Sequence, residues 1–302
     1  MRVLVTGASG FIGSHVTRML LAHGHGVAAL AVPGDPLRRL RDVADRLTVL
    51  FCDLRNSWDV ADRITAWRPE GCIHLAWYAE PGKYLCSPEN VPSLVASLGL
   101  LRVLIETGCR QVVMAGTCAE YDTDLGFLRE DSPPRPSTIY AATKLSMNLI
   151  GQQMAAAARI KFAWARLFYL YGPYEDERRV VPALIRSLMR SQPFLATEGE
   201  QVRDYLHVED VASALCTIME RDGNGVYNVC SGEPTTMRRL MRTIGELVGC
   251  PDLIQFGALP YRDWEPMFVC GDNTRLRALG WCPRYSLESG LRQSIDWMGE
   301  HS

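Results

Sequence analysis

The chain has 302 residues, of which 32 are basic and 34 acidic, and its formal charge is −2. This balance excludes the strongly basic surface that attracts nucleic acid or an anionic membrane, and it favours a small-molecule ligand. The length exceeds the roughly 150 residues of one minimal domain, so we expect one large domain or two interlocked ones.

Ten cysteines are scattered along the chain. They include no C-x-x-C pair and no Cys/His cluster at metal-ligand spacing, so we expect reduced, buried thiols and no metal site. The first residues predict a strand instead of a charged leader, and no later run is long enough to cross a bilayer. These features predict a cytoplasmic protein.

Short apolar runs alternate with longer helix-period segments in the first half of the chain. This alternation predicts βαβ units and a Rossmann-type, doubly wound parallel sheet of the α/β class. The predicted strands are 2–6, 26–32, 47–51, 71–75, 111–115 and 160–167. The predicted helices are 12–23, 57–67, 88–107 and 138–157.

The regular alternation fades near residue 170. Shorter helices are predicted at 180–190, 208–221, 235–248 and 286–298, between loops rich in Gly and Pro. We therefore expect a dinucleotide-binding domain over residues 1–170 and a smaller C-terminal lobe over 171–302 that binds mainly substrate. A strand at 225–229 is expected to rejoin the main sheet, so that about 200–231 returns to the first domain.

The first predicted strand runs into a glycine-rich loop and then a helix. Gly7, Gly10 and Gly13 stand where side chains would obstruct the turn, the approach of a pyrophosphate and the packing of the helix. The N-terminus of the following helix would face the phosphates. With a strand before it and a helix after it, the loop predicts a dinucleotide site, although an ordinary tight turn is the simpler alternative.

The G-x-x-G-x-x-G spacing resembles the extended, nucleotide-sugar-modifying branch of the short-chain dehydrogenase/reductases, the NAD-dependent epimerase/dehydratase family. The similarity continues through Asp53-Leu54, His74-Leu75-Ala76, Tyr171-Gly172-Pro173 and Arg203-Asp204-Tyr205. In that family the residue matching Asp53 holds the adenine, and the segment matching 74–76 passes under the cofactor. The resemblance implies a cofactor site made of Gly7, Gly10, Phe11, Ile12, Gly13, Asp53, Leu54, Leu75, Ala76, Asn90 and Lys144.

The end of the second strand distinguishes NAD from NADP, because an acidic residue there binds the ribose 2′-hydroxyl whereas arginine accommodates a 2′-phosphate. The matching position is Ala31, and the next charged residues are Asp35, Arg38 and Arg39. The arginine pair favours NADP(H). NAD(H) stays open, because Asp35 could fold back onto the ribose.

Tyr140 and Lys144 are four residues apart in a predicted helix, so they share one face. A neighbouring ammonium favours the ionised form of a phenol, which brings its pKa closer to neutral pH. Thr117 follows a predicted strand and matches the family's hydroxyl residue that binds the reacting oxygen. The resemblance implies hydride transfer to or from a sugar carbon, with Thr117, Tyr140 and Lys144 as catalytic residues.

Further motifs concern the substrate. Arg203 and Arg262 match the family's two diphosphate-binding arginines, and paired guanidinium bonds suit phosphate oxygens. The acidic pair that follows the threonine in the 4,6-dehydratases is here Cys118-Ala119, and Tyr169 replaces the Asn usual in epimerases and dehydratases. Candidates for lining the sugar pocket are Trp77, Tyr78, Glu120 and Tyr169.

These departures favour reduction of a nucleotide-linked 4-keto-6-deoxy hexose at C4. The nearest alternative is a nucleotide-sugar 4-epimerase with resident NAD, and a remote one is a non-catalytic NAD(P)-sensing protein. The resemblance also implies a homodimer formed by the helices 88–107 and 138–157. Their apolar positions Leu94, Val95, Leu98, Leu101, Leu145, Met147 and Ile150 fit such an interface and equally fit burial within one chain.

Overall fold

The computed structural model describes residues 1–262 and 265–301. Its centre is a seven-stranded sheet in which every neighbouring pair is parallel. The strands lie in the order β3 (Thr48–Phe51), β2 (Gly26–Ala31), β1 (Arg2–Thr6), β4 (Gly71–His74), β5 (Gln111–Thr117), β7 (Lys161–Leu167) and β11 (Gly225–Val229). From β1 the chain adds β2 and β3 on one side and then β4 and the later strands on the other. Ligands bind at this reversal of strand order, between β1 and β4, in sheets of this kind.

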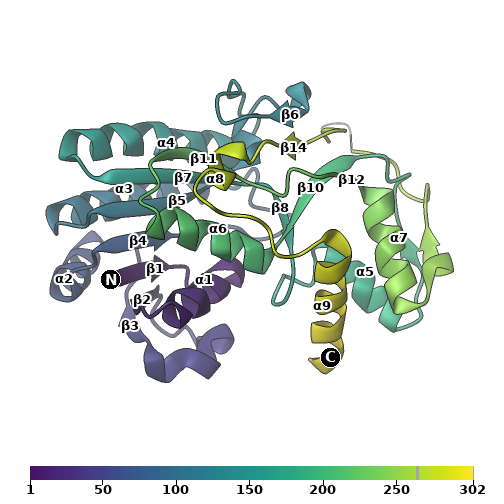
Figure 1. Ribbon diagram of the computed structural model, residues 1–302, viewed down its shortest axis with the longest axis horizontal. Helices are drawn as coiled ribbons and strands as arrows, with labels where there is room; N and C mark the ends of the chain where they lie inside the picture. Colours follow the sequence, from purple (N-terminus) through teal and green to yellow (C-terminus); the bar gives the residue numbers. More distant parts are fainter. Residues whose placement is uncertain (263–264, 302) are drawn as a thin grey trace.

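Helices cover both faces of the sheet (Figure 1). One face packs against α1 (Phe11–Ala22) and α6 (Val208–Glu220), and the other against α2 (Ser57–Trp67), α3 (Asn90–Glu106) and α4 (Ile139–Ala158). Because both faces are buried, the strands are continuously apolar.

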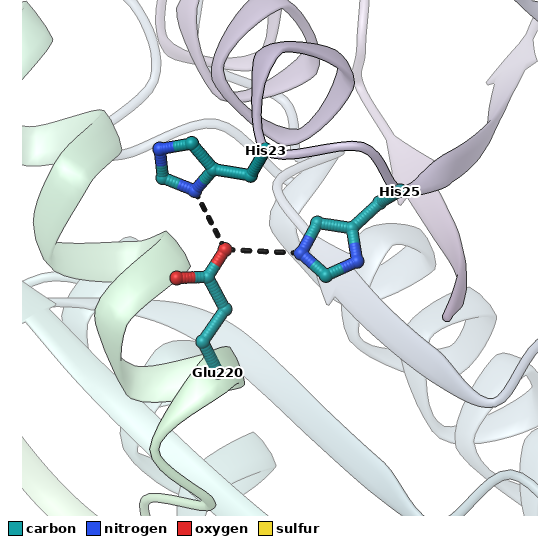
Figure 2. A group of neighbouring side chains, drawn as sticks. All are labelled: His23, His25 and Glu220. Atoms are coloured by element: carbon teal, nitrogen blue, oxygen red, sulfur yellow. Dashed lines mark hydrogen bonds and ion pairs between the residues drawn. The ribbon is translucent and has the colours of Figure 1, made fainter.

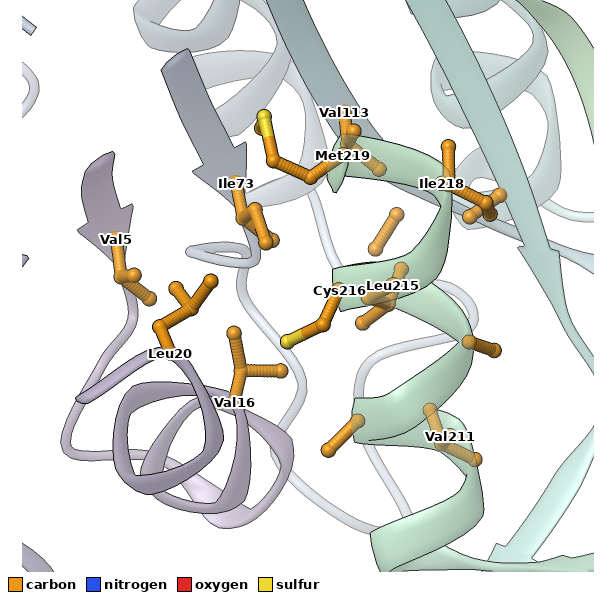
Figure 3. Packing of buried hydrophobic residues seen from close by; sticks show 14 of the residues in the cluster. Val5, Val16, Leu20, Ile73, Val113, Val211, Leu215, Cys216, Ile218 and Met219 are labelled. Atoms are coloured by element: carbon orange, nitrogen blue, oxygen red, sulfur yellow. The ribbon is translucent and has the colours of Figure 1, made fainter. Parts of the chain in front are cut away.

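Successive side chains of a strand enter different cores. In β1, Val3 and Val5 belong to the cluster beneath α1 and α6, whereas Leu4 belongs to the cluster on the other face. Figure 3 shows Val16 and Leu20 of α1 and Leu215 and Cys216 of α6 packed together over the strands.

A second lobe lies beside the sheet (Figure 1). It contains a separate core under α5, α7 and α9, and a small sheet ordered β12-β10-β8. Its elements are β8 (Tyr169–Tyr171), α5 (Val180–Met189), β9 (Phe194–Leu195), β10 (Val202–His207), β12 (Pro234–Thr236), α7 (Met237–Val248), η4 (Pro251–Leu253), β13 (Ile254–Gln255) and α9 (Leu287–Glu300).

The predicted strands of the main sheet and the predicted helices are confirmed within about two residues at each end. β11 does rejoin the main sheet beside β7, but β10 pairs with β8 and β12 instead. The return to the first domain is therefore shorter than 200–231. The unpredicted elements are short: η1 (Arg38–Arg46), η2 (Cys118–Glu120), η3 (Thr123–Leu125), β6 (Phe127–Leu128), β14 (Cys270–Gly271), α8 (Thr274–Arg277), and β8, β9, β10, β12, β13 and η4.

All ten cysteines are free, and most are buried. Within the described parts of the chain, no helix combines the length and the apolar character needed to cross a membrane.

Candidate active site

The glycine loop joins β1 to α1 and is shaped by close backbone contacts. Gly7 has a φ of +66°, and a Cβ there would lie 2.9 Å from the backbone nitrogen of Ala76. A Cβ on Gly13 would lie 2.0 Å from the carbonyl oxygen of Gly7. Only glycine fits these two positions.

The N-terminus of α1 is open to a ligand. Its N-cap is Gly10, which supplies no side-chain hydrogen bond, and the first turn contains no acidic residue. The first N–H groups of the helix, starting at Phe11 and Ile12, are therefore left for a phosphate. This arrangement fits the pyrophosphate of a dinucleotide.

The residues expected to select the cofactor lie against this loop. The carboxylate of Asp35 accepts a hydrogen bond from the Ser9 hydroxyl at 2.5 Å and another from the Leu37 amide at 2.8 Å. Arg39 donates to the Ser9 carbonyl at 3.3 Å and to the Tyr174 carbonyl at 3.2 Å. Arg38 is exposed on the same segment. The Asp35 carboxylate and the Arg39 guanidinium thus both contact Ser9 of the loop.

Further expected cofactor residues surround the strand ends. Asp53 follows β3 and forms an ion pair with Arg55 at 2.6 Å, whose hydrogen bonds lower the pKa of the carboxyl. Leu54 packs at the edge of one core, and Leu75 at the edge of the other. Ala76 lies directly under Gly7.

Asn90, another expected cofactor residue, has its side chain engaged inside the protein. Its side chain is fully buried, donates to the carbonyls of Tyr84 and Ser87 at 2.6 and 2.8 Å, and accepts from the Trp77 indole at 2.9 Å. Every polar atom of the amide is thereby used inside the protein. Asn90 holds the 76–89 segment against the start of α3.

The three predicted catalytic residues come together at the carboxyl end of β5. Thr117 is its last residue, and Tyr140 and Lys144 lie on α4, which starts after the N-cap Thr138. Burial raises the pKa of the Tyr140 phenol, and the neighbouring Thr117 side chain offsets this only in part, so the two hydroxyl groups lie close together.

Lys144 does not contact Tyr140 here. Its ammonium donates to the carbonyl of Ala115 at 2.8 Å and lies 3.9 Å from the centre of the Trp77 ring. Burial lowers the pKa of Lys144 to about 7. Burial, with Tyr84 as the second cause, raises the pKa of Tyr140 above its ordinary value. The pKa of the phenol is thus raised overall, and the role expected of Lys144 stays a prediction.

Glu120 is buried behind Thr117. The side chain is fully buried, forms an ion pair with Arg166 at 2.9 Å, and accepts hydrogen bonds from the Trp164 indole and the Thr117 amide. Burial raises the pKa of Glu120 despite these partners. Glu120 thus holds the backbone of Thr117 from the buried side, and its expected place in the sugar pocket stays a prediction.

Aromatic contacts involve two of the expected site residues, Tyr140 and Tyr169. Tyr84 meets the Tyr140 ring edge-on at 4.9 Å, and Tyr169 lies 5.8 Å from Tyr205. Tyr78 donates its hydroxyl to Glu80 at 3.0 Å. Tyr84 was not predicted, because it belongs to a loop whose path depends on the Asn90 contacts and leaves no periodic pattern.

The two arginines expected to bind the diphosphate differ from each other in burial. Arg203 is almost fully buried, donates to Glu265 at 3.0 Å and lies 5.2 Å above the Tyr169 ring. Arg262 is exposed, and its carbonyl accepts from the Glu265 amide at 3.0 Å. Glu265, which the sequence did not single out, therefore stands beside both arginines.

The geometry agrees with comparisons to known proteins. The model of the NAD dependent epimerase/dehydratase family matches residues 3–230. CDP-abequose synthase of Salmonella typhimurium is 28% identical, with 97% of each chain covered. The Thermotoga maritima UDP-glucose 4-epimerase solved with UDP-glucose has a TM-score of 0.89 at 25% identity, covering 100% of this chain and 99% of that one. The Thermus thermophilus UDP-glucose 4-epimerase solved with NAD has a TM-score of 0.87 at 28% identity, with 99% of each covered.

Proposed function

Because this chain belongs to the NAD dependent epimerase/dehydratase family, we propose that it reduces a nucleotide-linked 4-keto-6-deoxy hexose at C4. The names of its relatives, among them a CDP-abequose synthase and a UDP-glucose 4-epimerase, describe enzymes that act on nucleotide sugars. The substrate class follows from this kinship, whereas the reaction is argued from the residues around Tyr140.

The observation that carries the proposal is the aromatic contact at Tyr140 together with the tyrosine at position 169. The Tyr84 ring meets the Tyr140 ring edge-on at 4.9 Å, and Tyr169 stands where the family's epimerases and dehydratases use an amide. Aromatic faces favour apolar groups over hydroxyls. They suit the methyl group of a 6-deoxy sugar better than the hydroxymethyl group of glucose. Cys118, buried where a dehydratase has its acid, argues against elimination.

In the proposed reaction, Tyr140 and Thr117 act on the ketone oxygen. Burial raises the pKa of the Tyr140 phenol, which is protonated at neutral pH like an ordinary tyrosine and is the proposed proton donor. The hydroxyl of Thr117 hydrogen-bonds the same oxygen and holds it at the phenol. The reduced dinucleotide supplies the hydride to the carbonyl carbon. Lys144, which is buried beside the strand end and donates to the Ala115 carbonyl, would hold the ribose of the bound dinucleotide.

NADP(H) is the proposed cofactor. Ala31 leaves the end of β2 without a carboxylate, and Arg38 and Arg39 lie on the segment that flanks the glycine loop. A 2′-phosphate would gain charge-assisted hydrogen bonds from these guanidinium groups. One observation favours NAD instead: Asp35 already reaches the loop through Ser9 and could accept the ribose 2′-hydroxyl.

Charge substitutions distinguish the two cofactors. We expect Arg38→Glu to weaken NADPH binding at least tenfold and to leave NADH binding unchanged, as measured by fluorescence titration. Arg41→Glu, an exposed residue of the same η1 segment, is the matched control and leaves both unchanged. If Asp35→Asn weakens NADH binding while Arg38→Glu has no effect on NADPH, the enzyme uses NAD.

The 4-epimerase is the second candidate, since it needs the same three catalytic side chains. An epimerase returns the hydride to the sugar and keeps its NAD, whereas a reductase consumes its cofactor and must exchange it. Mass spectrometry and absorbance of the freshly purified protein separate them. We expect an empty dinucleotide site; stoichiometric NAD that co-purifies with the protein would establish the epimerase.

A further inference from the structure

Two histidines and a glutamate meet at the opposite end of the sheet from the active site. His23 caps the C-terminus of α1, His25 precedes β2, and Glu220 is the last residue of α6. His23 Nδ1 lies 2.7 Å and His25 Nε2 3.0 Å from the same oxygen, Oε1 of Glu220. Figure 2 shows both imidazole rings pointing at this carboxylate.

The three side chains line an open cleft of about 560 Å³ at the amino ends of β1, β5 and β7. Other charged groups in the cleft are paired with each other: Arg110 with Glu70 at 2.7 Å, and Lys161 with Asp222 at 2.8 Å. The amino group of Met1 lies 3.4 Å from the second nitrogen of His25. Neither neighbouring cation occupies the Glu220 carboxylate, so it remains available to the histidines.

We propose that His23, His25 and Glu220 bind a divalent transition-metal ion of the Zn²⁺ class. Two imidazoles and one carboxylate are a common ligand set for this ion, which then completes its coordination with water. Side-chain exposures of 46% for His23 and 29% for Glu220 leave room for that water. The proposal concerns a second site and is independent of the reaction at Tyr140.

The cluster needs only a small adjustment to accept the ion. Metal–ligand bonds of about 2.0–2.2 Å in a tetrahedron place neighbouring ligand atoms about 3.3 Å apart. The present distances of 2.7 and 3.0 Å are shorter by a few tenths of an ångström. The ligand nitrogens and oxygen already lie within 4.8 Å of one another. Because His23 and Glu220 are partly exposed, small side-chain rotations would open the gap.

The local backbone favours a cation and preserves the geometry. The helices α1 and α6 pack against each other, and both end at this cluster, so two partially negative helix C-termini face the site. Gly24, with a φ of +80°, makes the turn that puts His23 and His25 on the same side. The sequence alone does not indicate this cluster, because His23 and His25 are close in sequence but Glu220 is brought in only by the fold.

Metal binding to chelator-treated, reduced full-length protein tests the proposal. We expect one Zn²⁺ per chain by calorimetry and elemental analysis, and a thermal unfolding midpoint that rises with Zn²⁺. His23→Asn, His25→Asn and Glu220→Gln should each weaken binding at least tenfold. His301→Asn removes an exposed histidine at the other end of the chain and should change nothing.

Two further measurements separate loss of metal binding from loss of folding and from binding by cysteines. Circular dichroism without metal shows whether each variant is folded, and Co²⁺ spectra show whether thiolates take part, since the exposed Cys86 and Cys282 are other possible ligands. Weak visible bands without a strong near-ultraviolet thiolate band are expected. The proposal is overturned if the wild type binds no Zn²⁺, or if all three folded variants bind it as tightly as the wild type.

Discussion

At the residue scale, the burial of the Lys144 ammonium lowers the stability of the folded protein. This ammonium is buried, one hydrogen bond and one aromatic face replace water, and its pKa is lowered from 10.5 to about 7. Below pH 7 both folded and unfolded chains hold this proton, so the folded state bears the full cost. Between pH 7 and 10.5 the unfolded chain binds more protons, so the free energy of unfolding rises with pH.

We therefore expect Lys144→Met to be more stable than the wild type at pH 7 and to be catalytically inactive. Its advantage in the free energy of unfolding should shrink towards pH 10 by at most about 1.4 kcal/mol per pH unit. Urea denaturation of the cofactor-free proteins at several pH values measures this difference. Lys161→Met, a change at a half-exposed ion pair, is the control and should show no such trend. A pH-independent gap for Lys144→Met would contradict the account.

The sequence could place some of the expected site residues but not show the burial of others. Tyr140, Lys144 and Thr117 could be predicted, because helical spacing and a strand end place them at one edge of the sheet. The burial of Glu120 and Asn90 could not be predicted, because motif position does not show whether a polar side chain turns outward or is buried. Buried partners on distant elements, such as Arg166 for Glu120, decide that question.

The glycine loop is the element on which the proposed cofactor binding depends. A Cβ at Gly13 would overlap the Gly7 carbonyl, so Gly13→Ala must push the loop out of shape. We expect at least a tenfold loss of dinucleotide affinity by fluorescence titration, with a native circular dichroism spectrum. Gly99→Ala is the matched control: it lies inside α3 with nothing within 4 Å of the added Cβ. Unchanged affinity in Gly13→Ala would place the cofactor elsewhere.

At the element scale, the regular helices and the strands of the main sheet could be predicted from the spacing of apolar residues along the sequence. The short strands β8, β10 and β12 did not, because a small sheet built from non-adjacent segments leaves only a few residues of pattern in each. For the same reason the sequence could not show that β10 pairs outside the main sheet. The cofactor half of the site was thus more predictable than the substrate half.

The whole molecule is proposed to form a homodimer through α3 and α4. Leu101 and Met147, which the sequence offered for this interface, are fully buried within the chain. Val95 on α3 and Leu149 on α4 remain 64% and 57% exposed, and Ile150 is exposed beside Leu149. Apolar groups on two adjacent helices suit an interface that repeats in a second copy.

Light scattering after gel filtration tests this assembly. We expect a dimer for the wild type and a folded monomer for Val95→Glu, because a buried unpaired carboxylate at the interface opposes association. Leu195→Glu puts the same charge on a 49% exposed residue of the second lobe and should leave the dimer intact. A monomeric wild type, or a Val95→Glu dimer, would show that α3 and α4 do not form the interface.

The central step of the proposed reaction is the transfer of a hydride from a dinucleotide, which is consumed, to C4 of the sugar. Its most direct test is to supply NADPH deuterated at either face of the nicotinamide C4, together with a nucleotide-linked 4-keto-6-deoxy hexose, and to analyse the product by mass spectrometry and NMR. One of the two labelled cofactors should deliver one deuterium to C4 for each NADP⁺ released. Inversion at C4 of a nucleotide hexose, with no label taken from the added cofactor, would contradict the reductase and establish the epimerase.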